Sequence, residues 1–86
     1  MESEKLKINK VLCAILETLD ESEFGSIPES YAHLAIEQGG CEPAILIRLM
    51  VDGGLVARRP GPVLKITENG RLVAGEIRKH KQTVGA

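Results

Sequence analysis

In its last third the chain reads Asp52-Gly-Gly-Leu-Val-Ala-Arg-Arg-Pro-Gly-Pro-Val-Leu-Lys-Ile-Thr-Glu-Asn-Gly-Arg71. The two glycines after Asp52 predict the end of a helix, because glycine adopts the backbone conformations that terminate helices. Residues 55–59 and 63–66 predict two short strands, and Pro60-Gly61-Pro62 between them predicts a tight turn. Thr67 is a good N-cap for a following helix, since its hydroxyl can accept a hydrogen bond from a first-turn amide. The predicted order is therefore helix, strand, turn, strand, helix.

Upstream of this stretch, two further helices are predicted, the first of them from its apolar spacing. Apolar residues from Leu6 to Leu19 recur at steps of three and four, which places them on one face of a helix of about four turns. Phe24-Gly25 breaks that helix after an acidic segment. Pro43 suits the first position of another helix, which runs to about Asp52. The chain is therefore expected to be mostly helical, with a small sheet.

A short helix is predicted between these two, and its start can be interpreted in two ways. Ser26-Ile-Pro-Glu29 matches a capping box, in which the serine hydroxyl and the Glu29 carboxylate would each cap a backbone amide. Residues 24–27 also suit a brief strand that pairs before the helix begins. Gly39-Gly40 predicts the end of this helix.

Two segments resemble the winged-helix superfamily. His33-Leu-Ala-Ile-Glu-Gln-Gly39 is similar to the second helix and turn of a helix-turn-helix. Gly54-Leu-Val, followed by Leu64-Lys-Ile-Thr-Glu-Asn-Gly70, resembles the passage from helix to wing and the "L-T-E-x-G" start of the last helix in many small bacterial regulators. The resemblance implies an α+β, mostly α fold, ordered helix, short strand, helix, helix, strand, wing, strand, helix. A single domain is expected over residues 1–86, with an ordered core at about 5–80.

Many winged helices bind double-stranded DNA, with the third helix in the major groove and the wing near the backbone or minor groove, whereas others bind proteins. The composition bears on this choice. The chain has 86 residues with a formal net charge of -1 and a pI near 6.1. A free-standing nucleic-acid module is usually clearly basic, so this balance counts against DNA binding without excluding it. The charge is nonetheless segregated, because residues 20–23 are acidic and the last third carries most of the basic residues.

No residues have the spacing that metal binding or catalysis requires. His33, His80, Cys13 and Cys41 are scattered and form no ligand motif. The acidic residues at 20–23 suit a solvated loop. No apolar run approaches the ~20 residues that span a bilayer. We therefore expect a cytoplasmic protein that is not an enzyme and that uses no metal, cofactor or small-molecule ligand.

Four basic residues are the candidates for contacts with double-stranded DNA. Reading bases needs hydrogen-bonding side chains, and on the third helix only Arg48 qualifies well. The other three candidates lie at the wing and are Arg58, Arg59 and Lys65. Arg58 and Arg59 are expected on opposite faces of their strand, because strand side chains alternate. These wing residues suit either contacts with phosphate or solvated positions that protect a sheet edge from aggregation.

Two apolar surfaces are candidates for an interface. The third helix is apolar almost all round, which is typical of a helix that is buried on nearly every side. Ile45 and Leu49 extend its apolar surface, and they belong either to the core or to an interface with a second copy or another protein. On the last helix Leu72, Val73 and Ile77 suit either packing on the first helix or pairing with a partner helix.

Two hypotheses about function follow. In the first, the chain is a small winged-helix DNA-binding protein and transcriptional regulator, acting alone or as a homodimer. In the second, it is a winged-helix module for protein–protein interaction or assembly, without sequence-specific DNA binding. The superfamily resemblance favours the first hypothesis, and the near-neutral charge and apolar third helix favour the second.

Overall fold

The computed structural model describes residues 4–85, with side chains placed for residues 6–80. Within those residues the structure is α+β and mostly helical, with four helices and a three-stranded antiparallel sheet. The elements follow the chain as α1 (Glu4–Glu21), β1 (Ser26–Pro28), α2 (Glu29–Gln38), α3 (Pro43–Asp52), β2 (Val56–Arg59), β3 (Val63–Ile66) and α4 (Glu68–Gly85). This is the order of elements that the sequence predicts. Helix α4 continues to Gly85, past residue 80 where the predicted ordered core ends.

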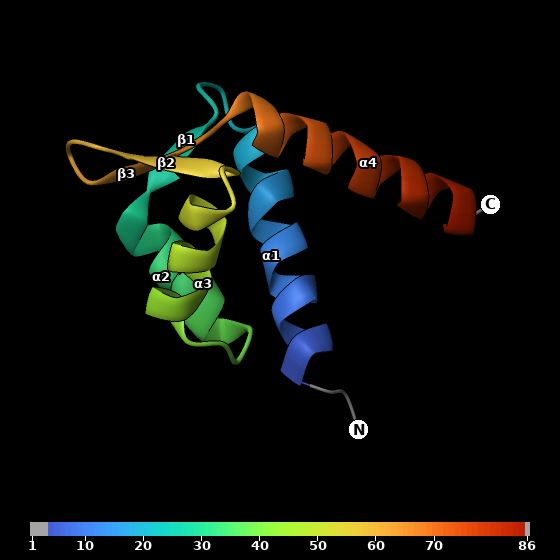
Figure 1. The fold of residues 1–86 in the computed structure, drawn as a ribbon, viewed down its shortest axis with the longest axis horizontal. Coiled ribbons are helices and arrows are strands. Elements are labelled where there is room, and N and C mark those ends of the chain that lie inside the picture. Colours follow the sequence, from blue (N-terminus) through green and yellow to red (C-terminus); the bar gives the residue numbers. More distant parts are fainter. Residues whose placement is uncertain (1–3, 86) are drawn as a thin grey trace.

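The sheet is small, and β3 is its central strand, in the order β1-β3-β2. Strand β1 pairs Ser26 with Lys65, and β2 pairs Val56 with Ile66. The β2–β3 hairpin extends to one side of α1, above α2 and α3, whereas α4 leaves on the other side (Figure 1). The sheet therefore closes one end of the helical layer and carries its hairpin away from α4.

The predicted capping box at Ser26 and Glu29 is wrong. Ser26 belongs to β1, and α2 begins at Glu29 with Pro28 as its N-cap and no side-chain capping hydrogen bond. The backbone amide of Glu29 donates instead to the carbonyl oxygen of Pro62 at 3.1 Å. Backbone pairing with β3 thus replaces the local cap, and the alternative prediction of a brief strand before this helix is confirmed.

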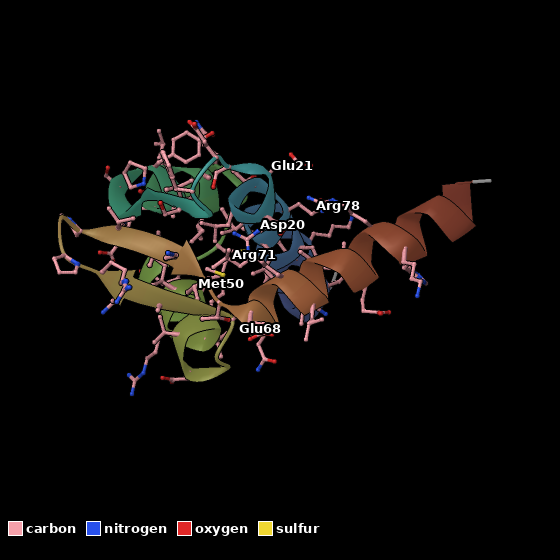
Figure 2. All side chains as sticks on the ribbon, turned by 90° about the horizontal axis from the view of Figure 1, so that it is seen from above. Asp20, Glu21, Met50, Glu68, Arg71 and Arg78 are labelled. Atoms are coloured by element: carbon pink, nitrogen blue, oxygen red, sulfur yellow. The ribbon has the colours of Figure 1, made fainter. Side chains whose placement is uncertain are left out.

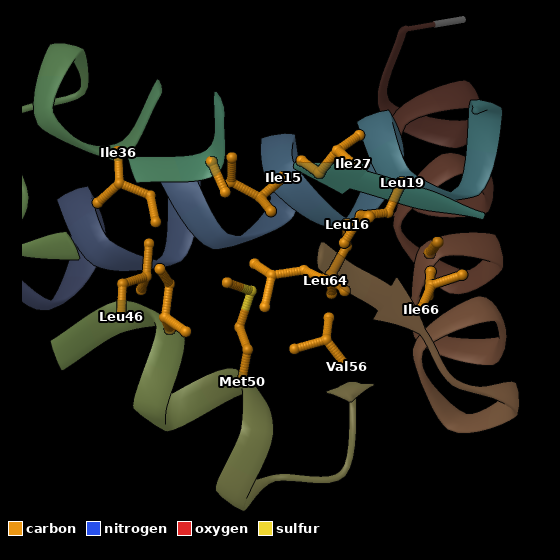
Figure 3. Close-up of a cluster of buried hydrophobic side chains, with 13 residues drawn as sticks. Ile15, Leu16, Leu19, Ile27, Ile36, Leu46, Met50, Val56, Leu64 and Ile66 are labelled. Carbon is orange, nitrogen blue, oxygen red and sulfur yellow. The ribbon is translucent and has the colours of Figure 1, made fainter. Parts of the chain in front are cut away.

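The core is aliphatic and lies where α1, α2, α3 and the sheet meet. Leu16 and Leu19 of α1 are fully buried, together with Met50 of α3 and Leu64 of β3 (Figure 3). No polar or charged residue with a described side chain is buried. The single phenylalanine, Phe24, lies 73% exposed in the turn after α1, so aromatic packing contributes nothing at that position.

Helix α4 is joined to the rest of the protein through its first turns. The Thr67 hydroxyl accepts a hydrogen bond from the Gly70 amide at 3.0 Å, which confirms Thr67 as the N-cap. That hydroxyl also donates to the carbonyl oxygen of Gly54, so the same side chain connects the start of α4 to the residues that follow α3. Gly70 and Ala74 are buried, which brings the start of α4 close to the sheet.

An ion-pair cluster joins α4 to the end of α1. Asp20, near the end of α1, accepts hydrogen bonds from Arg71 at 3.0 Å and from Arg78 at 2.5 Å (Figure 2). Arg78 also lies 3.4 Å from the Glu21 carboxylate. The hydrogen bond that Arg78 donates to Asp20 raises the pKa of Arg78, and the charges of both carboxylates add to that effect. The arginines on α4 are thus accounted for by contacts within the chain.

Candidate nucleic-acid interface

Helices α2 and α3 are consecutive and are joined by residues 39–42. Gly40 has a φ of +81°, a conformation that glycine adopts without steric cost. The Gly39 amide donates to the carbonyl of Ala35, which closes the last turn of α2. Pro43 then occupies the first turn of α3, where its missing amide hydrogen is not needed. This connection places α3 beside α2, with one long side of α3 facing solvent (Figure 1).

The inner side of α3 is buried and its outer side is not. Leu46, Ile47 and Met50 are almost fully buried against the core. Ile45 is 58% exposed and Leu49 is 49% exposed. Helix α3 packs on α2, α1 and β2, while α4 packs on α1 and β3, so these two side chains lie on a side that α4 does not cover. The interpretation of Ile45 and Leu49 as core residues is therefore wrong, and both are available for an interface.

A surface hollow of about 390 Å³ lies between α3 and β2, and two candidate arginines line it. We call it the α3–β2 hollow, and its lining residues are Ala44, Arg48, Val51, Asp52 and Arg58. Arg48 comes from the outer side of α3 and Arg58 from β2. The fold therefore brings together two cationic side chains that are ten positions apart in the sequence.

Each of these arginines has an acidic neighbour. The Arg48 Nε lies 3.7 Å from a carboxylate oxygen of Asp52, and both side chains are largely exposed. The Arg58 Nε lies 3.2 Å from a carboxylate oxygen of Glu29. The Arg48–Asp52 pair is exposed on both sides, and ion pairs of this kind contribute about 0–1 kcal/mol. An incoming phosphate can therefore replace Asp52 at little energetic cost, whereas the Glu29 side chain is only 25% exposed.

Strand register divides the remaining cationic candidates between two faces of the sheet. Arg58 pairs with Leu64, whose side chain is buried, so Arg58 lies on the face that carries the core. Arg59 pairs with Val63, and Lys65 pairs with Ala57. Because side chains alternate along a strand, Arg59 and Lys65 lie on the opposite face of the sheet from Arg58. The predicted placement of Arg58 and Arg59 on opposite faces is confirmed. All three basic side chains are exposed, but only Arg58 reaches the α3–β2 hollow.

Glu29 is the one residue of this region whose role sequence reasoning missed. The sequence predicts that Glu29 caps α2, whereas in the structure its carboxylate pairs with Arg58. No local signal could show this, because the contact depends on how β1 and β2 flank β3. The pair of Arg48 and Asp52, by contrast, follows from their spacing of four along a helix.

The apolar candidates on α4 separate into two groups. Ile77 is half-buried and packs against the core. Leu72 is 66% exposed, and Val73 is also exposed. All three candidates line a second hollow of about 750 Å³ between α1 and α4. We call it the α1–α4 hollow, and its lining residues are Asn9, Lys10, Cys13, Ala14, Leu72, Val73, Glu76, Ile77 and His80.

Among the residues that the structure describes, no cluster of histidine, cysteine or acidic side chains could hold a metal ion. None of the helices in that part of the chain has both the length and the apolar character to cross a membrane. Comparison of the chain with protein-family models, with curated proteins and with solved structures finds no match. The function of the chain is therefore inferred from the geometry of the surface around α3 and β2.

Proposed function

We propose that this chain is a small winged-helix DNA-binding protein that acts as a transcriptional regulator. In this proposal α2 and α3 form the helix-turn-helix and the β2–β3 hairpin is the wing. The observation that carries the proposal is the convergence of Arg48 and Arg58 on the α3–β2 hollow. A protein surface that follows a DNA groove needs cationic groups that contact the phosphate backbone. Here such groups come from a solvent-facing helix and from the adjacent hairpin.

Helix α3 would enter the major groove with its outer side. It has 10 residues and is therefore ~15 Å long, and the diameter of a helix with its side chains, ~10–12 Å, suits a groove ~12 Å wide. The guanidinium of Arg48 can donate to the O6 and N7 acceptors of guanine or to phosphate. Ile45 and Leu49 are exposed beside it, and aliphatic groups there can pack on the methyl group of thymine. Arg59, at the end of β2, would contact the backbone from the hairpin.

The acidic neighbours limit the affinity that this surface can reach. Asp52 and Glu29 offset the charges of Arg48 and Arg58, and the whole chain has a net charge of -1. Affinity would then come from a few phosphate contacts and not from a broad positive field. If the four candidate cations each neutralise one phosphate, the slope of log K against log salt is about -3.6, at roughly -0.9 per contact.

Fluorescence anisotropy with a pool of random duplex DNA, measured from low to moderate salt, tests this proposal. Arg48→Ala and Arg58→Ala should each weaken binding and reduce the steepness of the salt slope by about 0.9. Lys79→Ala is the matched control, since it removes the same charge from α4, away from α3 and β2. Absence of binding at low salt, or equal effects of all three variants, would contradict the proposal.

A second candidate function is a winged-helix module that binds another protein through α3. Ile45 and Leu49 favour it, because they place two large exposed aliphatic side chains four positions apart on one helix side. The same titration separates the two functions. Two results together would favour this second function. The chain would bind no duplex at low salt, and it would bind a hydrophobic dye more strongly than its Ile45→Ser and Leu49→Ser variants do.

A further inference from the structure

The two arginines of the α3–β2 hollow have acidic partners of different kinds. Arg48 and Asp52 are four positions apart on α3, and the Asp52 side chain is 70% exposed. Arg58 and Glu29 come from β2 and from the start of α2, and the Glu29 side chain is only 25% exposed. The atoms in contact are also closer in the second pair, at 3.2 Å against 3.7 Å. Asp52 is thus an exposed local neighbour, whereas Glu29 is a sheltered contact made by the tertiary fold.

Backbone contacts fix the position of Glu29 relative to the β2–β3 hairpin. Its amide donates to the carbonyl oxygen of Pro62, in the turn between the two strands, at 3.1 Å. Two positions earlier, Ile27 of β1 pairs with Leu64 of β3, and Arg58 of β2 pairs with Leu64 from the other side. The side chains of Ile27 and Leu64 are buried, so this row lies on the core face of the sheet. The Glu29 carboxylate therefore meets Arg58 from a backbone that is itself bonded to the hairpin.

The contact leaves part of the Arg58 side chain for a second anion. It involves Nε, the guanidinium nitrogen nearest to the aliphatic stem. A guanidinium has five N–H donors, and most of them are on its two terminal nitrogens. The Arg58 side chain is 60% exposed and lines the α3–β2 hollow. A carboxylate at Nε can therefore hold this side chain while the terminal nitrogens donate to phosphate.

We propose that Glu29 is a positioning residue for DNA binding, which holds Arg58 where that side chain meets phosphate; this inference rests on the proposed function. A long side chain loses rotamer freedom when it binds a ligand, and this loss weakens binding. The contact with Glu29 imposes part of that order before DNA arrives. Asp52 acts in the opposite direction, because phosphate must displace it from Arg48.

The two acidic residues should therefore have opposite effects on the affinity for DNA. Fluorescence anisotropy with random duplex DNA is measured at roughly 0.15 M salt, where a screening length of ~8 Å weakens repulsion between Glu29 and phosphates beyond Arg58. Glu29→Ala should weaken binding about 2- to 10-fold, the range expected when one long side chain is no longer ordered beforehand. Asp52→Ala should strengthen binding up to about 5-fold, since an exposed ion pair no longer competes.

Glu68→Ala is the matched control for loss of an acidic residue at a helix start. Glu68 is exposed in the first turn of α4, as Glu29 is in the first turn of α2, and α4 packs on α1 and β3. Both changes remove the same charge and the same interaction with a helix dipole. Glu68→Ala should bind duplex DNA within about 2-fold of wild type. Circular dichroism checks that all variants fold.

A double-mutant cycle shows whether Glu29 acts through Arg58. In the Arg58→Ala background, Glu29→Ala should not weaken binding, because no guanidinium is left to hold. A purely structural role of Glu29 in α2 would weaken binding by the same factor in both backgrounds, and that result would overturn the proposal.

NMR relaxation of the Arg58 Nε–Hε group gives a readout that needs no DNA. Its order parameter should fall by about 0.2 in Glu29→Ala, while that of Arg59, on the opposite face of the sheet, should not change. Absence of duplex binding by wild type would refute the proposed function itself. Failure of the present inference alone is a different result: wild type binds, but Glu29→Ala binds as tightly as wild type or tighter, or leaves the order of Arg58 unchanged.

Discussion

Replacing Gly70 with alanine tests how closely α4 is packed against the sheet. A Cβ atom at this position would lie 2.2 Å from the carbonyl oxygen of Leu55 and 2.6 Å from the Cγ1 of Ile66. The first of these atoms belongs to the backbone and cannot rotate away. The Leu55 carbonyl also accepts the Thr67 amide at 3.0 Å, so moving it would disturb the start of α4 as well.

The size of the effect follows from two opposing terms. Alanine is favoured over glycine inside a helix by about 0.8–1.0 kcal/mol. To accommodate the new methyl group, the contact at Gly70 must open by roughly 1 Å, which is a case of overpacking. Overpacking lowers the free energy of unfolding by about 1–3 kcal/mol, and we expect the upper end of this range because backbone atoms must move. We expect a net loss of about 2 kcal/mol, equivalent to a fall in Tm of roughly 8–16 °C for a domain of this size.

Gly75 provides the matched control, since it lies on the same helix and a Cβ atom there would have no neighbour within 4 Å. Gly75→Ala should therefore stabilise the chain by about 0.5–1 kcal/mol. Thermal unfolding of the three proteins, followed by circular dichroism at one protein concentration, gives both values. If Gly70→Ala proved as stable as Gly75→Ala, the close approach of α4 to Leu55 would be refuted.

Three further substitutions examine the core, the cap and the ion-pair cluster. Met50→Ala should lower the free energy of unfolding by about 2–5 kcal/mol in urea titrations, because Met50 is fully buried; a loss below 1 kcal/mol would contradict that burial. Thr67→Ala should cost about 0.5–2 kcal/mol in the same assay through loss of the α4 cap, whereas Thr67→Ser should retain most of the stability. Asp20→Asn should lower Tm by weakening the contacts with Arg71 and Arg78, and the difference from wild type should shrink in 1 M salt; a difference that does not depend on salt would point to another cause.

Local chemistry was enough to predict several elements of the fold. Helix α3 begins at Pro43 and ends before Gly53 because proline suits a first turn and Gly53-Gly54 suits a helix end. The β2–β3 hairpin follows from short apolar runs around a proline–glycine turn. The α4 cap follows from the hydroxyl of Thr67, which directly precedes the helix. In each case the deciding residues are neighbours in the sequence.

The boundary between β1 and α2 needed information from elsewhere in the chain. Ser26 has the side chain of a good cap, but its backbone pairs with Lys65, which lies far away in the sequence. The gain from completing the sheet outweighs one side-chain hydrogen bond. Capping preferences alone cannot show whether Ser26 caps the helix or pairs with the sheet. The local pattern therefore predicts the wrong start of α2.

The candidate interface was predictable in its residues but not in its arrangement. Alternation placed Arg58 and Arg59 on opposite faces, as the register confirms. Which face meets α3 depends on how the hairpin packs, and so does the contact of Arg58 with Glu29. The exposure of Ile45 and Leu49 likewise depends on which elements pack on α3, since α4 packs on α1 and β3 instead. These features arise from tertiary packing.

The salt dependence of duplex binding by the double variant Arg48→Ala/Arg58→Ala tests the central claim most directly. These two residues meet only because α3 and β2 frame one hollow. We expect a wild-type slope of about -3.6 in log K against log salt and a double-variant slope of about -1.8, at roughly -0.9 per phosphate contact. The double variant Lys79→Ala/Lys10→Ala, which removes the same charge from α4 and from the side of α1 that faces α4, should keep the wild-type slope. Equal slopes for wild type and the arginine double variant would contradict the assignment of this surface to DNA.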